Sequence, residues 1–293
     1  FLIGAEAWVR NLMFGIRSAR EYGGVMKVGY SPDAFGHIAH LPAILNGFGL
    51  DSVLIWRGVP KELTTSEFRW LSPDGSEVLV CHFPYGYGFM STLPEDREGL
   101  AKSLDTMRKL LEPMATTKYV LVPNGTDHLP AHAGLSSVIK QANAMLGDST
   151  MVHGNYPEFV AAVRQEIGRK YDELPAWQGE FRSSDRSHVL AGVLSTRMWL
   201  KQRYAHCEDL LARYAEPLVA WAHLLRRDSP DAEKTKSDKG LLQHAWKLLL
   251  QNGPHDSVTG CSVDAVYDDV GLRFQKVDQI AQAQRPRVGE GNR

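Results

Sequence analysis

The chain has 293 residues, of which 43% are hydrophobic and 23% charged, and its formal net charge is −1. This composition is typical of a globular protein with one large or two ordinary domains, and it offers no excess of positive charge for nucleic acid or an anionic membrane. No apolar run approaches the roughly 20 residues that a membrane-spanning helix needs. The three cysteines, Cys81, Cys207 and Cys261, are too scattered for a disulfide framework or a thiolate zinc site, and they favour a reducing, cytoplasmic compartment.

The first half of the chain alternates helix and strand patterns. Apolar residues at helical spacing predict helices over 3–16, 41–48, 94–111, 135–142 and 155–167, and apolar runs predict strands over 25–30, 53–56, 76–83 and 118–122. Asn155 and Glu158 have the spacing of a capping box at the start of the last of these helices. Repeated strand–loop–helix units of this length favour an α/β fold, with a mostly parallel sheet or barrel and helices outside it.

Beyond about residue 190 the strand patterns disappear. Helices are expected over 190–225, with one break at Pro217, and again over 241–250 and 263–281. The charged segment 226–239 is expected to be a solvated linker, and the polar tail 284–293 is expected to be disordered. The sequence therefore predicts a β/α domain over 1–190 and a helical bundle over 191–283.

Three aspartates occupy turns bounded by Gly or Pro. Asp33 follows the strand over 25–30, Asp127 follows the strand over 118–122, and Asp256 stands next to His255 in the turn over 251–260. Cleavage of a glycosidic bond needs two carboxyl groups, one as nucleophile or base and one as proton donor. Partial desolvation beside His128 would keep Asp127 protonated as the acid, which leaves Asp33 as nucleophile, metal ligand or both.

Imidazole and carboxylate both suit zinc, so His255 is a candidate metal ligand. From spacing alone, however, Asp33 and Asp127 could equally cap the helices that follow them, which is a routine role for Asp. The sequence lacks a phosphate-binding glycine loop before a helix, a Gly-x-Ser-x-Gly motif and a redox cysteine pair. These gaps argue against the common nucleotide, esterase and thiol chemistries.

Five segments, in order along the chain, resemble glycoside hydrolase family 38, the α-mannosidases. They are Pro-Asp-Ala-Phe-Gly-His-Ile-Ala-His-Leu-Pro at 32–42, Asn-Gly-Thr-Asp-His at 124–128, Gly-Glu-Phe-Arg at 179–182, Leu-Ser-Thr-Arg-Met at 194–198 and Pro-His-Asp-Ser-Val-Thr-Gly-Cys-Ser at 254–262. The resemblance implies a seven-stranded β/α barrel, incomplete in this chain, followed by a three-helix bundle that carries a zinc histidine. It also implies a retaining exo-α-mannosidase that uses one zinc ion and acts on α-mannosides or mannose-containing glycans.

The resemblance assigns a role to each candidate residue. Asp33 matches the nucleophile, which also binds zinc, His255 matches a second zinc ligand, and Asp127 falls where the general acid/base is expected. Four further residues fall near positions that hold the sugar, namely Arg57, Tyr87, His128 and Asp256. In this scheme Asp33 attacks the anomeric carbon while Asp127 protonates the leaving oxygen.

One departure from the family pattern leaves two functional hypotheses. The family supplies its other two zinc ligands from a His-x-Asp pair on its first strand, and this chain contains no His-x-Asp. The family's C-terminal β domains are also absent, so we expect a fragment that associates into homo-oligomers. The chain either forms part of a zinc-dependent α-mannosidase, or it is a catalytically silent fragment or mannose-binding module. The carboxyl separation is informative, because retention predicts about 5–5.5 Å and inversion about 6.5–9.5 Å.

Overall fold

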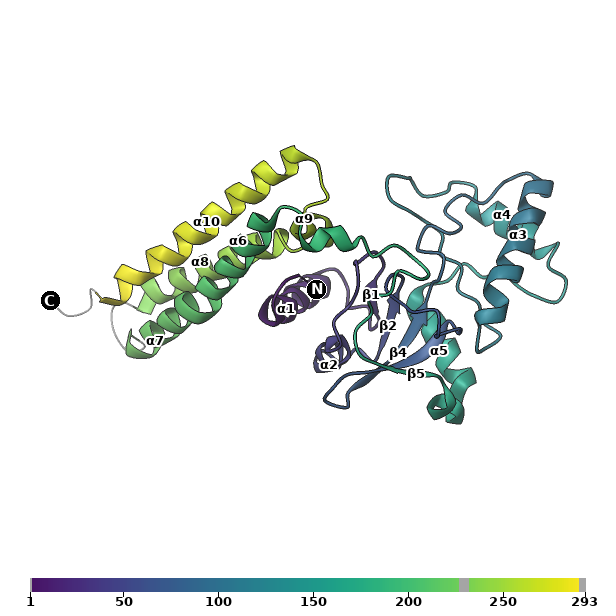
Figure 1. Cartoon of the computed structure of the whole chain (residues 1–293), viewed down its shortest axis with the longest axis horizontal. Helices are drawn as coiled ribbons and strands as arrows, with labels where there is room; N and C mark the ends of the chain where they lie inside the picture. The colour runs from purple at the N-terminus through teal and green to yellow at the C-terminus, as the bar shows by residue number, and fades with distance from the viewer. Residues whose placement is uncertain (1, 227–231, 290–293) are drawn as a thin grey trace. The chain divides into compact units, whose positions relative to one another are not determined.

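A computed structural model describes residues 2–226 and 232–289, and the chain divides into two compact units (Figure 1). The first unit, called here the sheet unit, is Val25–Val189. The second, called the helical unit, joins the N-terminal segment up to Gly24 to the chain from Leu190 onward. The N-terminal helix, which the sequence analysis assigned to the β/α domain, thus clusters with the C-terminal helices.

The sheet unit is built on five strands in the order β1-β2-β4-β3-β5. Neighbouring strands run parallel except β3 and β4, which are antiparallel. The strands are β1 (Gly29–Ser31), β2 (Ser52–Ile55), β3 (Glu67–Leu71), β4 (Glu77–His82) and β5 (Ala176–Gln178). Because this order has two ends, β1 and β5, the described residues give an α/β fold with an open sheet and do not confirm the expected barrel.

Helices cover the sheet because its strands are apolar on both faces. All four residues of β2 are buried, as expected for a parallel strand enclosed by helices. Helix α5 (Tyr156–Ile167) contributes Val160 and Val163 to a core that contains Leu54 and Leu79 of the sheet. The Asn155 side chain caps this helix by accepting the Glu158 N–H at 3.0 Å, which confirms the N-cap half of the predicted capping box.

The other helices of the sheet unit follow the predicted periodicities. They are α2 (Leu41–Gly47), α3 (Arg97–Leu111) and α4 (Leu135–Asn143), with short 3₁₀ turns at Glu112–Met114 and Gly168–Glu173. Helices α3 and α4 pack on one another through Leu104 and Val138.

The expected buried strand over 118–122 is wrong. The backbone there joins no sheet and is only partly buried. Its N–H groups are taken by side chains, since Lys118 donates to Glu166 at 2.8 Å and Tyr119 donates to Thr117 at 3.2 Å. Side-chain acceptors of this kind compete with a strand ladder, so an apolar run alone did not determine the structure.

The helical unit is a bundle around the buried side chains of Tyr204, Trp246 and Phe274. In Figure 1 the long helix α10 runs alongside α8 and α6. The elements are α1 (Ala5–Glu21), a 3₁₀ turn (Ala191–Leu194), α6 (Met198–Asp209), a π-helix (Leu210–Ala215), α7 (Glu216–Arg226), α8 (Ala232–Gln251), α9 (His255–Thr259) and α10 (Asp264–Gly289).

Helix α1 is tied to the bundle at its first turn. The carboxylate of Glu208, 8% exposed on α6, accepts the N–H of Gly4 at 2.9 Å and that of Ala7 at 3.1 Å. The first N–H groups of a helix have no partner within the helix, so a buried acceptor at this point stabilises both helix and contact. A Cβ at position 4 would lie 2.3 Å from the Glu208 carboxylate, so a larger residue there would displace this side chain from the two N–H groups.

Two expectations for the second half are corrected. The segment over 226–239 is not a linker throughout, because residues 232–239 form the first turns of α8, whereas 227–231 lie outside the described residues. The tail is helical from 284 to 289 at the end of α10, and 290–293 also lie outside the described residues. Within the part of the chain that the structure describes, no helix combines the length and apolar character needed to span a bilayer.

Candidate active site

Three neighbouring parallel strands end at the same edge of the sheet, and each is followed by a candidate residue. Strand β1 pairs with β2, and β2 pairs with β4. Asp33 comes two residues after β1, Arg57 two residues after β2, and Tyr87 in the loop after β4. The carboxyl ends of parallel strands are where α/β folds place their ligands, so the topology itself assembles these side chains.

Asp33 and Arg57 form a direct ion pair. The Arg57 Nε lies 2.5 Å from Asp33 Oδ1, and the two side chains are 13% and 19% exposed, so water screens the pair only partly. The guanidinium also donates from Nη1 to the carbonyl of His188 at 2.7 Å and lies 3.8 Å from the centre of the Trp56 ring. These contacts hold Arg57 rigidly and thereby fix the orientation of the Asp33 carboxylate.

Tyr87 connects Asp33 to Asp127. Its hydroxyl donates to Asp127 Oδ2 at 2.5 Å and lies 3.5 Å from Asp33 Oδ2. Burial raises the pKa of the Tyr87 phenol above its ordinary value, and the bonded Asp127 and the charge of Asp33 raise it further. The hydroxyl therefore keeps its proton at physiological pH and acts as a hydrogen-bond donor.

The two carboxylates are consequently close. Their Oδ2 atoms lie at most about 6 Å apart, which is the sum of the 2.5 Å and 3.5 Å contacts to the shared phenol oxygen. Asp33 is largely shielded from solvent, whereas Asp127 is exposed. One carboxylate thus sits inside the site and the other at its open side.

Glycine allows the loop that carries Tyr87 to pack against its neighbours. A Cβ at Gly86 would lie 2.9 Å from the Trp56 ring, and one at Gly88 would lie 2.8 Å from the Thr126 hydroxyl. The loop that carries Asp127 is fixed from the other side, because the Asn124 amide donates to the Met90 carbonyl at 2.6 Å. Small residues and side-chain bonds therefore bring the two loops together.

His128 has a left-handed backbone conformation, with φ of 63°, and is exposed. This conformation is uncommon for a residue with a Cβ, and such strain concentrates at functional positions. His128 follows Asp127 directly and therefore lies in the same exposed loop.

His255 and Asp256 belong to the helical unit, at the start of α9. The His255 Nε2 lies 3.7 Å from Asp256 Oδ1, and this oxygen also accepts a hydrogen bond from Cys261 Sγ at 3.0 Å. The Asp256 carbonyl accepts the Tyr267 hydroxyl at 3.2 Å. These bonds order the turn over 254–262 around the two side chains.

The described residues do not contain a complete metal site. No group of three or more His, Cys, Asp or Glu side chains among residues 2–226 and 232–289 is arranged to hold a metal ion. Asp33 offers a carboxylate and His255 an imidazole, which are suitable donor types for zinc, but Asp33 Oδ1 is bound to Arg57. The residues present therefore do not form a zinc site by themselves.

The sequence segments singled out for their resemblance meet within each unit. In the sheet unit, His37 and Phe181 exchange backbone hydrogen bonds of 2.9 Å and 3.0 Å. In the helical unit, Arg197 donates to the Gly260 carbonyl at 3.2 Å. Segments far apart in the sequence are thus structurally coupled.

Two contributors to the site were missed in the sequence. Trp56 contacts Arg57 and also meets the Tyr87 ring edge-on, with ring centroids 5.6 Å apart. An aromatic residue at the end of a strand, directly before a candidate Arg, was a signal that could have identified it. His188 contributes only a carbonyl, and no sequence signal identifies such a contact.

Comparisons with known proteins place both units in one family of enzymes. Residues 2–180 match the family described as "Glycosyl hydrolases family 38 N-terminal domain", and residues 188–285 match "Alpha mannosidase middle domain". The solved structure of an alpha-mannosidase from Enterococcus faecalis V583 is 29% identical, with a TM-score of 0.89 over 99% of this chain and 32% of that chain.

Two curated relatives have similar coverage. A Halalkalibacterium halodurans protein named "Putative mannosylglycerate hydrolase" is 30% identical over 95% of this chain and 31% of its own length. Alpha-mannosidase G of Dictyostelium discoideum is 33% identical over 94% of this chain and 24% of its own length. The chain therefore spans about a quarter to a third of the length of these relatives. Because the first family match covers more than half of the chain, the chain belongs to glycosyl hydrolase family 38.

Proposed function

We propose that the chain carries the central catalytic residues of an α-mannosidase, which hydrolyses terminal α-D-mannosyl residues with retention of anomeric configuration. The observation that carries the proposal is the cluster of Asp33, Arg57, Tyr87 and Asp127, in which one phenol contacts both carboxylates. Paired carboxylates on a rigid sheet edge are the group that glycoside hydrolysis needs.

The carboxylate spacing supports the retaining course. The upper limit of about 6 Å between the two Oδ2 atoms falls below the roughly 6.5–9.5 Å that leaves room for an attacking water. Such a short approach favours direct attack by the inner carboxylate over attack by an intervening water. We assign that attack on the anomeric carbon to Asp33 and protonation of the leaving oxygen to Asp127.

The two assignments follow from the surroundings of each group. Asp33 is inside the site and ion-paired with Arg57, so it is oriented as an anion. Asp127 is at the exposed side, where a leaving group departs and water enters. Tyr87, which stays protonated, donates its single O–H to Asp127 and lies 3.5 Å from Asp33, so it holds the two carboxylates close together. After the leaving group departs, Asp127 takes a proton from a water molecule. The water oxygen then bonds to the anomeric carbon, the bond between that carbon and Asp33 breaks, and mannose is released.

The substrate class is proposed from the family and from relatives' names. Several relatives are named alpha-mannosidases and one is named for mannosylglycerate, so the mannosyl group is shared while the group bonded to it differs. We therefore propose an α-mannoside as substrate, with Arg57, Tyr87, His128 and Asp256 as candidate sugar contacts.

The zinc ion, the cellular compartment and the oligomeric state are also proposed. Asp33 and His255 are the donors that the chain offers to a zinc ion. A cytoplasmic location is supported by three free cysteines, two of them buried. Association into a homo-oligomer is proposed from the sequence alone.

The proposal is tested with an aryl α-mannoside, with and without added zinc, on this chain and on a longer protein that contains it. Asp33→Asn should lower kcat on the order of 1,000-fold or more, because the nucleophile is lost. The matched control is Asp105→Asn, since Asp105 is exposed on α3 and pairs there with Lys109 at 2.7 Å. Equal turnover in the two variants would contradict the proposal. Mannose binding without turnover in any form would favour a binding module instead.

A further inference from the structure

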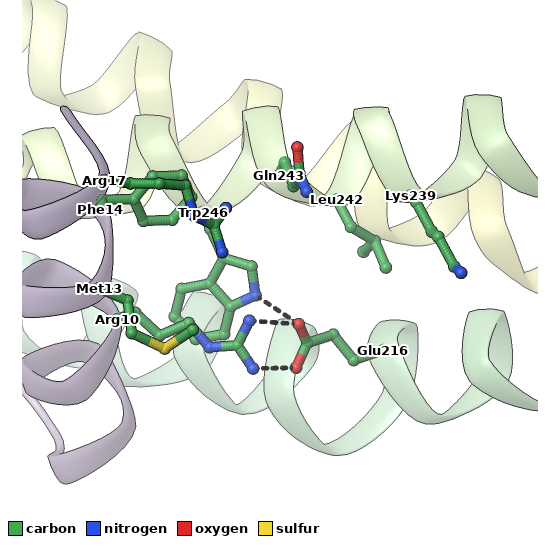
Figure 2. A pocket seen from close by; sticks show the side chains of 9 residues that line it. All are labelled: Arg10, Met13, Phe14, Arg17, Glu216, Lys239, Leu242, Gln243 and Trp246. Atoms are coloured by element: carbon green, nitrogen blue, oxygen red, sulfur yellow. Dashed lines mark hydrogen bonds and ion pairs between the residues drawn. The ribbon is translucent and has the colours of Figure 1, made fainter. Parts of the chain in front are cut away.

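The helical unit contains a cavity of about 180 Å³ that is separate from the residues assigned above. It lies where α1, the start of α7 and α8 meet, and Figure 2 shows side chains from these elements around it. Its lining residues are Arg10, Met13, Phe14, Arg17, Glu216, Lys239, Leu242, Gln243 and Trp246.

The interior wall of this cavity is apolar and rigid. Trp246 is 1% exposed and Leu242 is 6% exposed, so both are fixed in the core of the bundle. Phe14 adds a partly buried second aromatic ring from α1. Trp246, covered by the Arg10 guanidinium at 4.6 Å from its ring centre, forms the floor together with Leu242. Phe14 with the exposed Met13 offers the apolar surface that a ring-sized group can contact.

The single acidic side chain of the lining, Glu216, is already neutralised. Arg10 donates to its two oxygens at 2.6 Å each, and the Trp246 indole donates to it at 3.2 Å (Figure 2). A bidentate guanidinium–carboxylate pair of this kind is the strongest common ion-pair geometry. Glu216 therefore has little capacity left to bind a cation or to repel an anion.

Two cations of the lining have no such neutralising partner. Among the residues that the structure describes, neither Arg17 nor Lys239 makes an ion pair. The Arg17 guanidinium lies 5.8 Å from the centre of the Phe14 ring, and the Lys247 ammonium lies the same distance from that ring. The cavity thus combines an aromatic wall with uncompensated positive charge.

An unusual backbone conformation adjoins the cavity. The π-helix Leu210–Ala215 ends at Glu216, whose N–H donates to the Leu211 carbonyl five residues earlier. Pro217 follows and cannot donate a backbone hydrogen bond, so a regular α-helix is interrupted there. Such π-segments occur frequently at functional sites, and this one sets the position of the Glu216 carboxylate in the lining.

We propose that this cavity binds a small organic anion, a carboxylate or phosphate ester that carries one ring-sized apolar group. Its volume suits the size of the ligand, because a dry cavity of about 150 Å³ holds a benzene molecule. The ring lies against Phe14 and Met13, and the anionic group is bound by Arg17 and Lys239. This binding site is independent of the mannosidase proposal, since it uses none of the same residues.

The test is isothermal titration of the full chain with benzoate and with phenyl phosphate, alongside benzyl alcohol and inorganic phosphate. We expect benzoate or phenyl phosphate to bind with a Kd on the order of a millimolar or below, and the neutral alcohol at least about 10-fold more weakly. Arg17→Gln and Lys239→Gln should each weaken the anion by about 3- to 10-fold. Both side chains are exposed, so neither change threatens the fold.

Two further variants distinguish binding in the cavity from nonspecific binding to surface charge. Gln243→Trp should fill the cavity and abolish binding without removing a charge. Arg20→Gln, an exposed cation on the same helix outside the lining, should bind like the parent. The proposal is overturned if benzyl alcohol binds as tightly as benzoate, or if inorganic phosphate matches phenyl phosphate. It is also overturned if Arg17→Gln, Lys239→Gln and Gln243→Trp all leave the affinity unchanged.

Discussion

The hydroxyl of Tyr87 offers the most specific test of how the two carboxylates cooperate. Tyr87→Phe removes one oxygen atom, which bonds Asp127 at 2.5 Å and lies 3.5 Å from Asp33. The ring itself stays, including its edge-on contact with Trp56 at 5.6 Å between centroids. The change therefore isolates the hydrogen bonds from the packing.

The expected magnitude follows from these distances. The 2.5 Å bond to a carboxylate is charge-assisted and should contribute about 1.5–3 kcal/mol, whereas the 3.5 Å contact contributes little. Because Asp127 becomes a carboxylate only as it gives up its proton, this bond strengthens in the transition state, and its loss should lower kcat by about 10- to 150-fold. Since Tyr87 is only partly buried, the free energy of unfolding should change by less than about 1 kcal/mol.

The assay is steady-state hydrolysis of an aryl α-mannoside across pH, with urea unfolding of the same samples. Because the pKa of the Tyr87 phenol is raised, the parent should show no loss of activity from Tyr87 ionisation below about pH 10. The matched control is Tyr85→Phe, because Tyr85 stacks on Phe89 and makes no contact with the carboxylates. A Tyr87→Phe variant with kcat within twofold of the parent would refute the bridging role.

Three further predictions concern the ion pair, the attachment of α1 and acid stability. Arg57→Lys should lower kcat by about 10- to 100-fold, because an ammonium cannot bind Asp33 while also retaining the other guanidinium contacts. A variant with unchanged kcat would contradict the role of the Asp33–Arg57 pair. Glu208→Ala should destabilise the helical unit by about 2–4 kcal/mol in urea unfolding, since the N–H groups of Gly4 and Ala7 lose their carboxylate acceptor. A loss below about 0.5 kcal/mol would show that the attachment of α1 does not depend on Glu208. Burial lowers the pKa of His37 to about 3 and that of His82 to about 4, against an ordinary value of 6.5, so the unfolded chain takes up these protons first. Stability is then complete above about pH 6.5 and decreases as the pH falls towards the folded values, by about 2 kcal/mol per histidine at pH 5, which urea midpoints at pH 7 and pH 5 will check.

The parts of the fold that were predictable depend on local patterns. The strands that precede Asp33, Arg57 and Tyr87 were identified because short apolar runs end there in turn residues. Strand β3 was missed although Phe68 and Trp70 alternate with charged residues, a pattern typical of a strand. Strand β5 has three residues, too few for any periodicity to appear.

The remaining errors come from contacts between distant residues. The antiparallel pairing of β3 with β4 depends on which strands become neighbours, and periodicity does not encode this. Likewise, Tyr87 and Asp127 meet because glycine at 88 lets two loops touch, so their hydrogen bond was outside the reach of motif reasoning. The candidate residues could be named from the sequence, but the distances and hydrogen bonds between them depend on the fold.

The most direct test of the central claim is to trap the covalent intermediate. A fluorinated α-mannosyl fluoride, which slows the second step, is incubated with the active protein, and the modified peptide is identified by mass spectrometry. We expect one added fluoromannosyl group, located on Asp33 and absent from Asp33→Asn. A label on any other carboxylate, or hydrolysis that inverts the anomeric configuration in NMR spectra, would contradict it.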